Sequence, residues 1–266
     1  MKAQLLVFAI TSFLLGSAAN VSSQEKKGTP KWEDWDITIG LEVQYEPISP
    51  GMDETKLVRM PYLDIEYKNR YFIKSDIGIG AFLVPSDVGR DYLVGVAVGY
   101  DDGRKEADAP TLLEGLGSID GSAEAIIFGE KELGPVIFEL EFAKGLSSSG
   151  HNGFRADLSA AVESMVTERL GLRVGPFITY GDGKYIESYY GITAEQADRS
   201  AIYKEYKTSG GFESYGLEVN AFFKLSQNWS LICSGDYTRL LGDAKDSPIV
   251  KNPGFFDVTT AIVYTF

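Results

Sequence analysis

Apolar and polar side chains alternate at every second position along several stretches of this 266-residue chain. The clearest stretch covers residues 35–45, where one face carries Trp35, Ile37, Ile39, Leu41, Val43 and Tyr45. Because successive side chains of a β-strand point to opposite sides, this period of two predicts a strand with one apolar and one polar face. At ~3.3 Å per residue and with a tilt, such a strand spans roughly 25 Å, the height of the lipid-facing band of an outer-membrane barrel.

The same alternation recurs along the rest of the chain. It is clear over residues 92–101, 214–225, 229–238 and 255–266, and weaker over 59–68, 70–83, 119–131, 134–144, 153–167 and 170–180. With the first stretch these make about eleven strands, whereas a barrel with both termini in the periplasm requires an even number. A turn within residues 70–90, at Asp76-Ile77-Gly78 or at Pro85-Ser86-Asp87, would supply another strand. We therefore predict an all-β, antiparallel transmembrane β-barrel of about twelve strands, with about ten as the alternative.

The segments between these strands are of two kinds. Leu133-Gly134-Pro135, Glu168-Arg169 and Ser226-Gln227-Asn228 are typical of tight turns. Residues 145–152, 181–211 and 241–254 form longer segments rich in Gly, Ser, Asp and Lys. Outer-membrane barrels have short periplasmic turns and long external loops, so we assign the two kinds accordingly. Within the longest loop, Thr193 and Gln196 have the spacing of a capping box and predict a short helix over residues 193–200.

The start of the chain has the organisation of a secretory signal peptide. A basic residue, Lys2, precedes an apolar run over residues 5–15, and Ser17 and Ala19 follow as a pair of small residues. The apolar run is too short to cross a bilayer, which needs roughly 20 residues. We predict a signal peptide over residues 1–19, a flexible leader over 20–34 and one barrel domain over 35–266.

Aromatic side chains at the ends of the apolar faces favour a membrane barrel over a soluble β-sandwich or lipocalin-like barrel. The soluble folds also alternate, but their strands usually have about five or six residues, and those predicted here are about twice as long. Girdles of aromatic residues border the lipid-facing band of membrane barrels. The predicted girdle consists of Trp35, Tyr45, Tyr92, Tyr100, Tyr215, Trp229, Tyr237, Tyr264 and Phe266.

Charge and composition exclude several other classes of protein. The formal net charge of -13 argues against nucleic-acid binding, because that function needs basic surface to neutralise phosphates. Cys233 is the single cysteine, so no intramolecular disulfide can form. The mean hydropathy of -0.08 excludes a bundle of membrane helices. It does not exclude a barrel, whose strands face lipid only at every second residue.

The polar faces of the strands predict a charged barrel interior. The candidate lumen charges are Glu42, Asp64, Glu66, Glu139, Glu141, Asp157, Glu218, Arg155, Arg173 and Lys224. A conducting lumen with this excess of carboxylates would favour cations. In the other interpretation, which we favour, the carboxylates pair with the basic residues across a closed interior, and the 181–211 loop folds into the barrel.

Several segments resemble one family of outer-membrane proteins. Residues 239–250 read Arg-Leu-Leu-Gly-Asp-Ala-Lys-Asp-Ser-Pro-Ile-Val, and residues 185–197 read Tyr-Ile-Glu-Ser-Tyr-Tyr-Gly-Ile-Thr-Ala-Glu-Gln-Ala. With 35–40, 61–65 and 116–120, these segments resemble the MipA/OmpV family of MltA-interacting outer-membrane proteins over essentially the whole predicted mature chain. The loop that carries the most specific motif includes Leu241, Gly242, Asp243, Asp246, Ser247 and Pro248. We expect Asp243, Asp246 and Ser247 to order this loop by capping backbone N–H groups.

This resemblance implies that the protein lies in the outer membrane, and it says less about the biochemical function. The best-described member of the family is a scaffold that joins a murein lytic transglycosylase to a murein synthase, and other members are described as antigens, adhesins or proteins of osmotic and antibiotic response. The resemblance implies contact with outer-membrane lipid and lipopolysaccharide and supplies no catalytic residue. A murein enzyme would have to bind the periplasmic side, through leader residues 20–34 or the turns near 133, 168 and 227.

The one histidine, His151, offers the main route to a catalytic function. It lies in Ser147-Ser148-Ser149-Gly150-His151-Asn152-Gly153, and a Ser–His pair with a third, orienting group could attack a lipid ester. Adjacent residues of a loop rarely form such a triad, so we expect a polar turn with a solvated histidine. One His and one Cys cannot build a zinc site based on these ligands. We predict no catalytic residue, cofactor or metal, and a lipid-acting enzyme stays a remote alternative.

Overall fold

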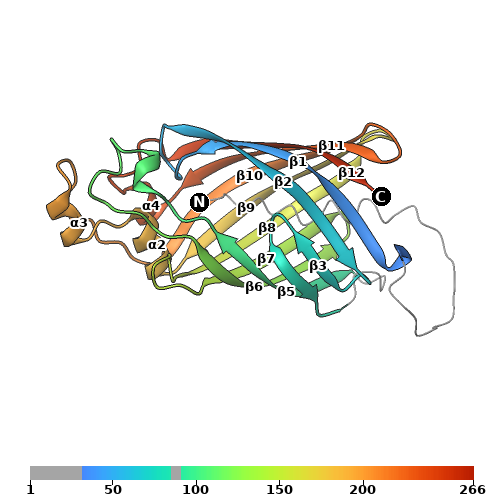
Figure 1. Ribbon diagram of the computed structural model, residues 1–266, viewed down its shortest axis with the longest axis horizontal. Coiled ribbons are helices and arrows are strands. Elements are labelled where there is room, and N and C mark those ends of the chain that lie inside the picture. The colour runs from blue at the N-terminus through green and yellow to red at the C-terminus, as the bar shows by residue number, and fades with distance from the viewer. Residues whose placement is uncertain (1–31, 85–90) are drawn as a thin grey trace.

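The computed structural model describes residues 32–84 and 91–266 (Figure 1). Within these residues twelve strands close into a barrel in which each strand runs antiparallel to its neighbours in sequence and β1 pairs with β12, so the predicted fold is confirmed. The strands are β1 (Trp35–Pro47), β2 (Thr55–Tyr67), β3 (Tyr71–Lys74), β4 (Gly78–Phe82), β5 (Tyr92–Asp101), β6 (Ser122–Leu133), β7 (Val136–Gly145), β8 (Phe154–Met165), β9 (Leu170–Gly181), β10 (Gly211–Lys224), β11 (Trp229–Leu240) and β12 (Gly254–Thr265). The predicted signal peptide lies outside the described residues, as does the predicted leader up to residue 31.

The twelfth strand arises where one strand was predicted over residues 70–83. The chain turns at Ser75-Asp76-Ile77, the first of the two predicted positions, and so divides this stretch into the short hairpin β3–β4. The backbone N–H of Ile77 donates to Asp76 Oδ1 at 2.9 Å. Gly78 leaves the turn at φ 101°, a conformation that favours glycine.

The two ends of the barrel differ as predicted. Short connections lie at one end, over residues 68–70, 134–135, 166–169 and 225–228, and long ones at the other, over 48–54, 102–121, 146–153, 182–210 and 241–253. Figure 1 shows the long loops gathered opposite the end marked C. They carry the 3-10 helix η2 (Glu106–Asp108) and the helices α2 (Gly183–Tyr190), α3 (Ala194–Arg199) and α4 (Gly242–Lys245), while η1 (Trp32–Asp34) precedes β1.

Helix α3 is the helix predicted inside the longest loop. Thr193 Oγ1 accepts from the N–H of Gln196 at 3.2 Å, and the N–H of Thr193 donates to Gln196 Oε1 at 2.8 Å. Both halves of the capping box are therefore formed.

The outer surface of the strands is apolar. Leu41, Leu217 and Val258 point outward and are 68%, 47% and 46% exposed. Aromatic rings pair at the strand ends, with centroid distances of 4.6 Å between Trp35 and Tyr67 and 4.9 Å between Tyr237 and Phe256. An apolar outer surface with aromatic borders is stable in a bilayer and unfavourable in water. No helix in the described part of the chain is long and apolar enough to cross a membrane.

Part of the interior is also apolar, which the predicted lumen charges do not indicate. Phe72 of β3, Phe82 of β4 and Phe128 of β6 point inward and pack with ring centroids 4.9–6.1 Å apart. Gly95 of β5 lies directly against Phe128, so a Cβ at this position would come within 2.2 Å of the ring. Small inward residues on β5 thus make room for large ones on β6.

Candidate functional site: an ion-paired interior and a closed mouth

Arg155 of β8 organises one group of the predicted lumen charges. Its Nη2 lies 3.0 Å from Glu141 Oε1, and its Nε lies 3.3 Å from Asp157 Oδ2. Thr179 Oγ1 donates to the other oxygen of Asp157 at 2.7 Å. All four side chains are buried inside the barrel, where the two carboxylates share one guanidinium instead of facing open water.

Arg173 of β9 organises a second group nearer the turns. It forms an ion pair with Glu139 and another with Glu218, whose Oε1 lies 3.5 Å from Arg173 Nε. Ser159 Oγ donates to Glu139 Oε2 at 2.9 Å. The side chains of Arg173, Glu139 and Glu218 are at most 5% exposed. This buried cluster links β7, β8, β9 and β10.

A third group uses a basic residue that the sequence did not single out. Lys74 of β3 lies with its Nζ 3.3 Å from Asp64 Oδ1 and 2.7 Å from Glu66 Oε1. Glu42 lies half-buried on the inward face of β1. Lys224, by contrast, lies exposed at the end of β10, so the proposed pairing role belongs to Lys74 rather than Lys224.

Helix α2 packs into the loop end of the barrel, and the sequence reasoning missed it. Tyr185, Ile186, Tyr189 and Tyr190 are each at most 2% exposed. Counted from Tyr185, the other three residues follow after one, four and five positions, which places all four on one face of a helix. This spacing could have revealed the helix from the sequence. Asp182 Oδ1 accepts from the N–H of Tyr185 at 2.8 Å and so caps the helix.

Gly153 explains how closely α2 approaches the wall. A Cβ on Gly153 would lie 2.3 Å from the backbone nitrogen of Tyr185, so only glycine allows this contact. The helix packs against β8, β9 and β10 and against α4.

Hydrogen bonds fix α2 to three separate parts of the wall and loops. Tyr189 donates to Asp101 Oδ1 at 2.5 Å, and Tyr190 donates to Glu213 Oε1 at 2.5 Å. Arg104 Nη1 donates to the carbonyl oxygen of Tyr189 at 3.0 Å. Burial, and next the nearby carboxylates, raise the pKa of the Tyr189 and Tyr190 phenols well above their ordinary value.

The family-motif loop joins this arrangement through Asp243 and Ser247. Asp243 Oδ2 accepts from the N–H of Ser209 at 2.7 Å and from its hydroxyl at 2.8 Å. Ser247 Oγ donates to the carbonyl oxygen of Tyr190 at 2.6 Å. We expected these side chains to order their own loop. Ser247 does so, because its Oγ accepts from the N–H of Ile249 at 3.4 Å, and it also binds the neighbouring loop 182–210. The Asp243 carboxylate binds Ser209 of that neighbouring loop instead.

The other residues of the motif loop shape its path. Gly242 has φ 50° and starts α4, and Leu241 is the residue before that helix. Asp246 is exposed and pairs only weakly with Lys245, at 3.4 Å. Pro248 accepts at its carbonyl oxygen from Lys251 Nζ at 3.1 Å.

A second apolar layer covers α2 from outside. Met52, Leu113, Ile192 and Ile249 come from four different loops and form one buried cluster. Together with α2, this layer closes the loop end of the barrel across the described residues. The arrangement therefore favours the closed interior over a conducting lumen.

His151 lies inside the structure, and the expectation of a solvated histidine is wrong. It is 1% exposed, because the ring packs against Tyr185 with centroids 5.3 Å apart. Its Nδ1 accepts from the N–H of Gly153 at 3.1 Å, so the ring hydrogen is on Nε2, which donates to Glu124 Oε1 at 3.0 Å. Both nitrogens are engaged in structure, and Ser147 bonds Ser149 instead, at 3.0 Å.

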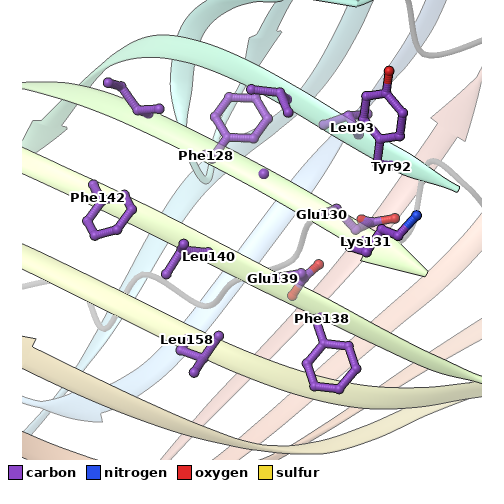
Figure 2. Close-up of a pocket in the computed structure, with 13 residues that line it drawn as sticks. Tyr92, Leu93, Phe128, Glu130, Lys131, Phe138, Glu139, Leu140, Phe142 and Leu158 are labelled. Carbon is purple, nitrogen blue, oxygen red and sulfur yellow. The ribbon is translucent and has the colours of Figure 1, made fainter. Parts of the chain in front are cut away.

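The described residues contain no cluster of three or more His, Cys, Asp or Glu side chains arranged to hold a metal ion. A hollow of about 520 Å³ lies on the barrel wall over β5–β8 (Figure 2). Figure 2 shows Phe138, Leu140 and Leu158 along it, with Tyr92 on the other side. Most of its lining side chains are apolar, and Glu130, Lys131 and Glu139 are the charged ones among them (Figure 2).

Comparison with known proteins identifies one family over nearly the whole barrel and individual relatives over about a third of the chain. Residues 39–266 match the family model described as MltA-interacting protein MipA. The chain is 31% identical over 98 residues to the MltA-interacting protein of Escherichia coli, covering 36% of this chain and 39% of that one. It is 30% identical over 89 residues to the outer membrane protein OmpV of Vibrio cholerae, covering 34% of each chain. These alignments span well under half the length of either relative.

Proposed function

Because the chain belongs to the MltA-interacting protein family and is an outer-membrane barrel, we propose that it is a non-enzymatic anchor for a murein-degrading enzyme. In this function the barrel holds a lytic transglycosylase, and through it a murein synthase, at the inner surface of the outer membrane. The name of the Escherichia coli relative, MltA-interacting protein, supports a partner of this kind.

The closed mouth is the observation that carries this proposal. Helix α2 and the apolar layer above it fill the loop end of the barrel, and Arg155 and Arg173 pair with carboxylates inside it. A barrel built in this way is suited to a structural task. It is poorly suited to the alternative of a cation-preferring channel, which needs a continuous hydrated path.

The periplasmic turns offer the surface that a murein enzyme could bind. Leu133, Val166 and Leu225 lie at or next to three of these turns and are 56%, 57% and 44% exposed. Exposed apolar side chains beside polar ones are typical of a docking surface between proteins. We therefore place the proposed contact at the turns after β6, β8 and β10.

A pull-down from detergent-solubilised outer membranes tests this function. A lytic transglycosylase serves as bait, and a porin serves as the background control. We expect the wild-type chain to be enriched over the porin, and Leu133→Ser with Val166→Ser to reduce that enrichment. Leu146→Ser with Ile202→Ser is the matched control, because these side chains are 59% and 58% exposed at the opposite end of the barrel. Equal recovery of the chain and the porin would refute the anchor function.

A further inference from the structure

Among the described residues, the strand pairing between β2 and β5 is short, because the β3–β4 hairpin covers only part of each strand. β2 pairs with β1 along its whole length, but with β3 only over Asp64–Tyr67. β5 pairs with β4 only over Gly95–Val98. The loop-side parts of these two strands therefore have no strand between them in the described structure. Figure 1 shows the short β3–β4 hairpin between β2 and β5.

This lateral opening has a defined frame. At the border nearer the short turns, Ser75 forms two hydrogen bonds with the edge of β2. Its N–H donates to the carbonyl oxygen of Leu63 at 2.9 Å, and its Oγ accepts from the N–H of Leu63 at 2.8 Å. At the border nearer the long loops, Met52 belongs to one buried cluster with Leu113 and Leu116, which joins the 48–54 loop to the 102–121 loop. The sides are the loop-side parts of β2 and β5.

The edge of β2 exposes polar backbone groups to this opening. Since the N–H and C=O of Leu63 point away from β1, the alternation along the strand directs those of Pro61, Arg59 and Leu57 to the same side. Pro61 has no N–H, as is usual on an edge strand. The N–H groups of Arg59 and Leu57 have no hydrogen-bond partner among residues 32–84 and 91–266. A bare sheet edge of this kind is unfavourable against lipid chains.

Arg59 adds a positive charge beside the same edge. Its side chain is exposed and points outward. Arg59 lies opposite Val43 of β1, and the next outward-facing pair toward the loops is Leu57 with Tyr45. No carboxylate within the described residues pairs with it. A guanidinium in such a place needs an anion, and its donors match the oxygens of a phosphate.

We propose that the lateral opening binds a phosphorylated glycolipid of the outer leaflet. Arg59 holds a phosphate, and the carbonyl oxygens of the acyl linkages accept from the N–H groups of Arg59 and Leu57. The polar headgroup and its acyl linkages, rather than hydrocarbon, then cover this part of the edge of β2. The outer leaflet is the source, because the unpaired edge lies toward the long-loop end of the barrel. This lipid site does not depend on the murein-enzyme function.

Arg239 provides a matched control for Arg59. It is also an exposed, outward-facing arginine toward the loop end, but its strand is paired on both sides, with Tyr215 of β10 and Gly254 of β12 opposite it. The full chain in lipid nanodiscs would be titrated with lipid A, and bound lipid measured by native mass spectrometry. We expect Arg59→Gln to weaken lipid A binding about tenfold, the equivalent of one charge-assisted contact, and Arg239→Gln to change it less than about twofold.

Two further probes identify the lipid. Lipid A without phosphates and phosphatidylglycerol are each expected to bind the wild-type chain about tenfold more weakly than lipid A. Equal loss of binding in the two arginine variants, or phosphatidylglycerol binding as tightly as lipid A, would overturn the proposal. Heat-modifiable migration on gels verifies that each variant is folded.

A cross-linking measurement keeps the proposal testable if Arg59→Gln fails to fold. A photo-reactive amino acid replaces Leu57 at the opening or, as control, Leu217 on the complete wall, which are 54% and 47% exposed. We expect lipid A adducts at position 57 in at least about fivefold excess over position 217. Equal labelling at the two positions would contradict a lipid site at the opening.

Discussion

Tyr190 donates its hydroxyl hydrogen to Glu213 at 2.5 Å, and this contact joins α2 to the wall of the barrel. The two side chains are 1% and 3% exposed, so water does not replace the bond if it is broken. A neutral phenol beside a buried carboxylate satisfies that carboxylate without adding charge. Polar contacts therefore hold the helix that closes the mouth, and these contacts are stronger in the buried interior than they would be in water.

The closed mouth predicts that the wild-type protein does not conduct. In planar bilayers we expect no steady current from inserted wild-type protein, and frequent openings from the double variant Tyr189→Ala with Tyr190→Ala, because this change removes the rings and the bonds to Asp101 and Glu213. Tyr100→Ala is the control, since Tyr100 is 58% exposed on the outer surface of β5. Steady conductance of the wild-type protein would show that the mouth is open.

Alkaline titration should report the same packing. Burial raises the pKa of Tyr185, Tyr189 and Tyr190 well above the ordinary value. Because the folded pKa lies above the unfolded pKa, their contribution to stability is complete below about pH 10 and decreases as the pH rises further. We expect the ultraviolet absorbance of tyrosinate to rise in two steps, with the late step coupled to loss of loop structure. In Tyr189→Phe with Tyr190→Phe the late step should shrink, and an unchanged late step would refute the assignment.

The barrel was predictable because alternation depends only on neighbouring residues. The face Trp35 to Tyr45 needs no distant contact to be recognised, and the odd strand count pointed to the turn at Asp76. The interior was harder, because the partners of a lumen charge lie on other strands. Lys74, not Lys224, completes the ion pairs near Asp64, and only the register of β3 with β2 brings them together.

The mouth of the barrel was predicted least well. Residues 185–190 were assigned to a loop, although their apolar residues follow the helical period. His151 was expected in solvent, since its neighbours in sequence are Gly, Ser and Asn. Its burial depends on Tyr185 and Glu124, which lie 34 and 27 positions away along the chain. Packing between distant segments is information that a local pattern does not contain.

His151 should matter for stability and not for lipid chemistry. His151→Ala leaves Glu124 and the N–H of Gly153 without partners inside the barrel, and we expect a loss of about 1–3 kcal/mol in the free energy of unfolding. Urea unfolding followed by gel migration measures this loss. His151→Gln, which can keep one of the two bonds, should lose less. The lipid A and phospholipid profiles of cells carrying either variant should match those of wild-type cells, and a changed profile would restore the enzymatic alternative.

The cluster around Arg173 should be the most sensitive part of the interior. Arg173→Met leaves Glu139 and Glu218 buried without their positive partner, and we expect a loss of about 3–5 kcal/mol in the free energy of unfolding. Lys224→Met, which removes an exposed cation from the end of β10, should change it by less than about 0.5 kcal/mol. Urea titration in detergent micelles provides both values.

A compensating variant distinguishes lost charge balance from lost packing at Arg173. Adding Glu139→Gln and Glu218→Gln to Arg173→Met removes the two uncompensated charges while nearly keeping side-chain volume. If charge balance dominates, the triple variant should recover more than half of the stability lost by Arg173→Met, because neutral amides cost less to bury than carboxylates. If the triple variant is no more stable than Arg173→Met, packing of the arginine accounts for the loss. The ion pairs would then contribute little to closing the interior.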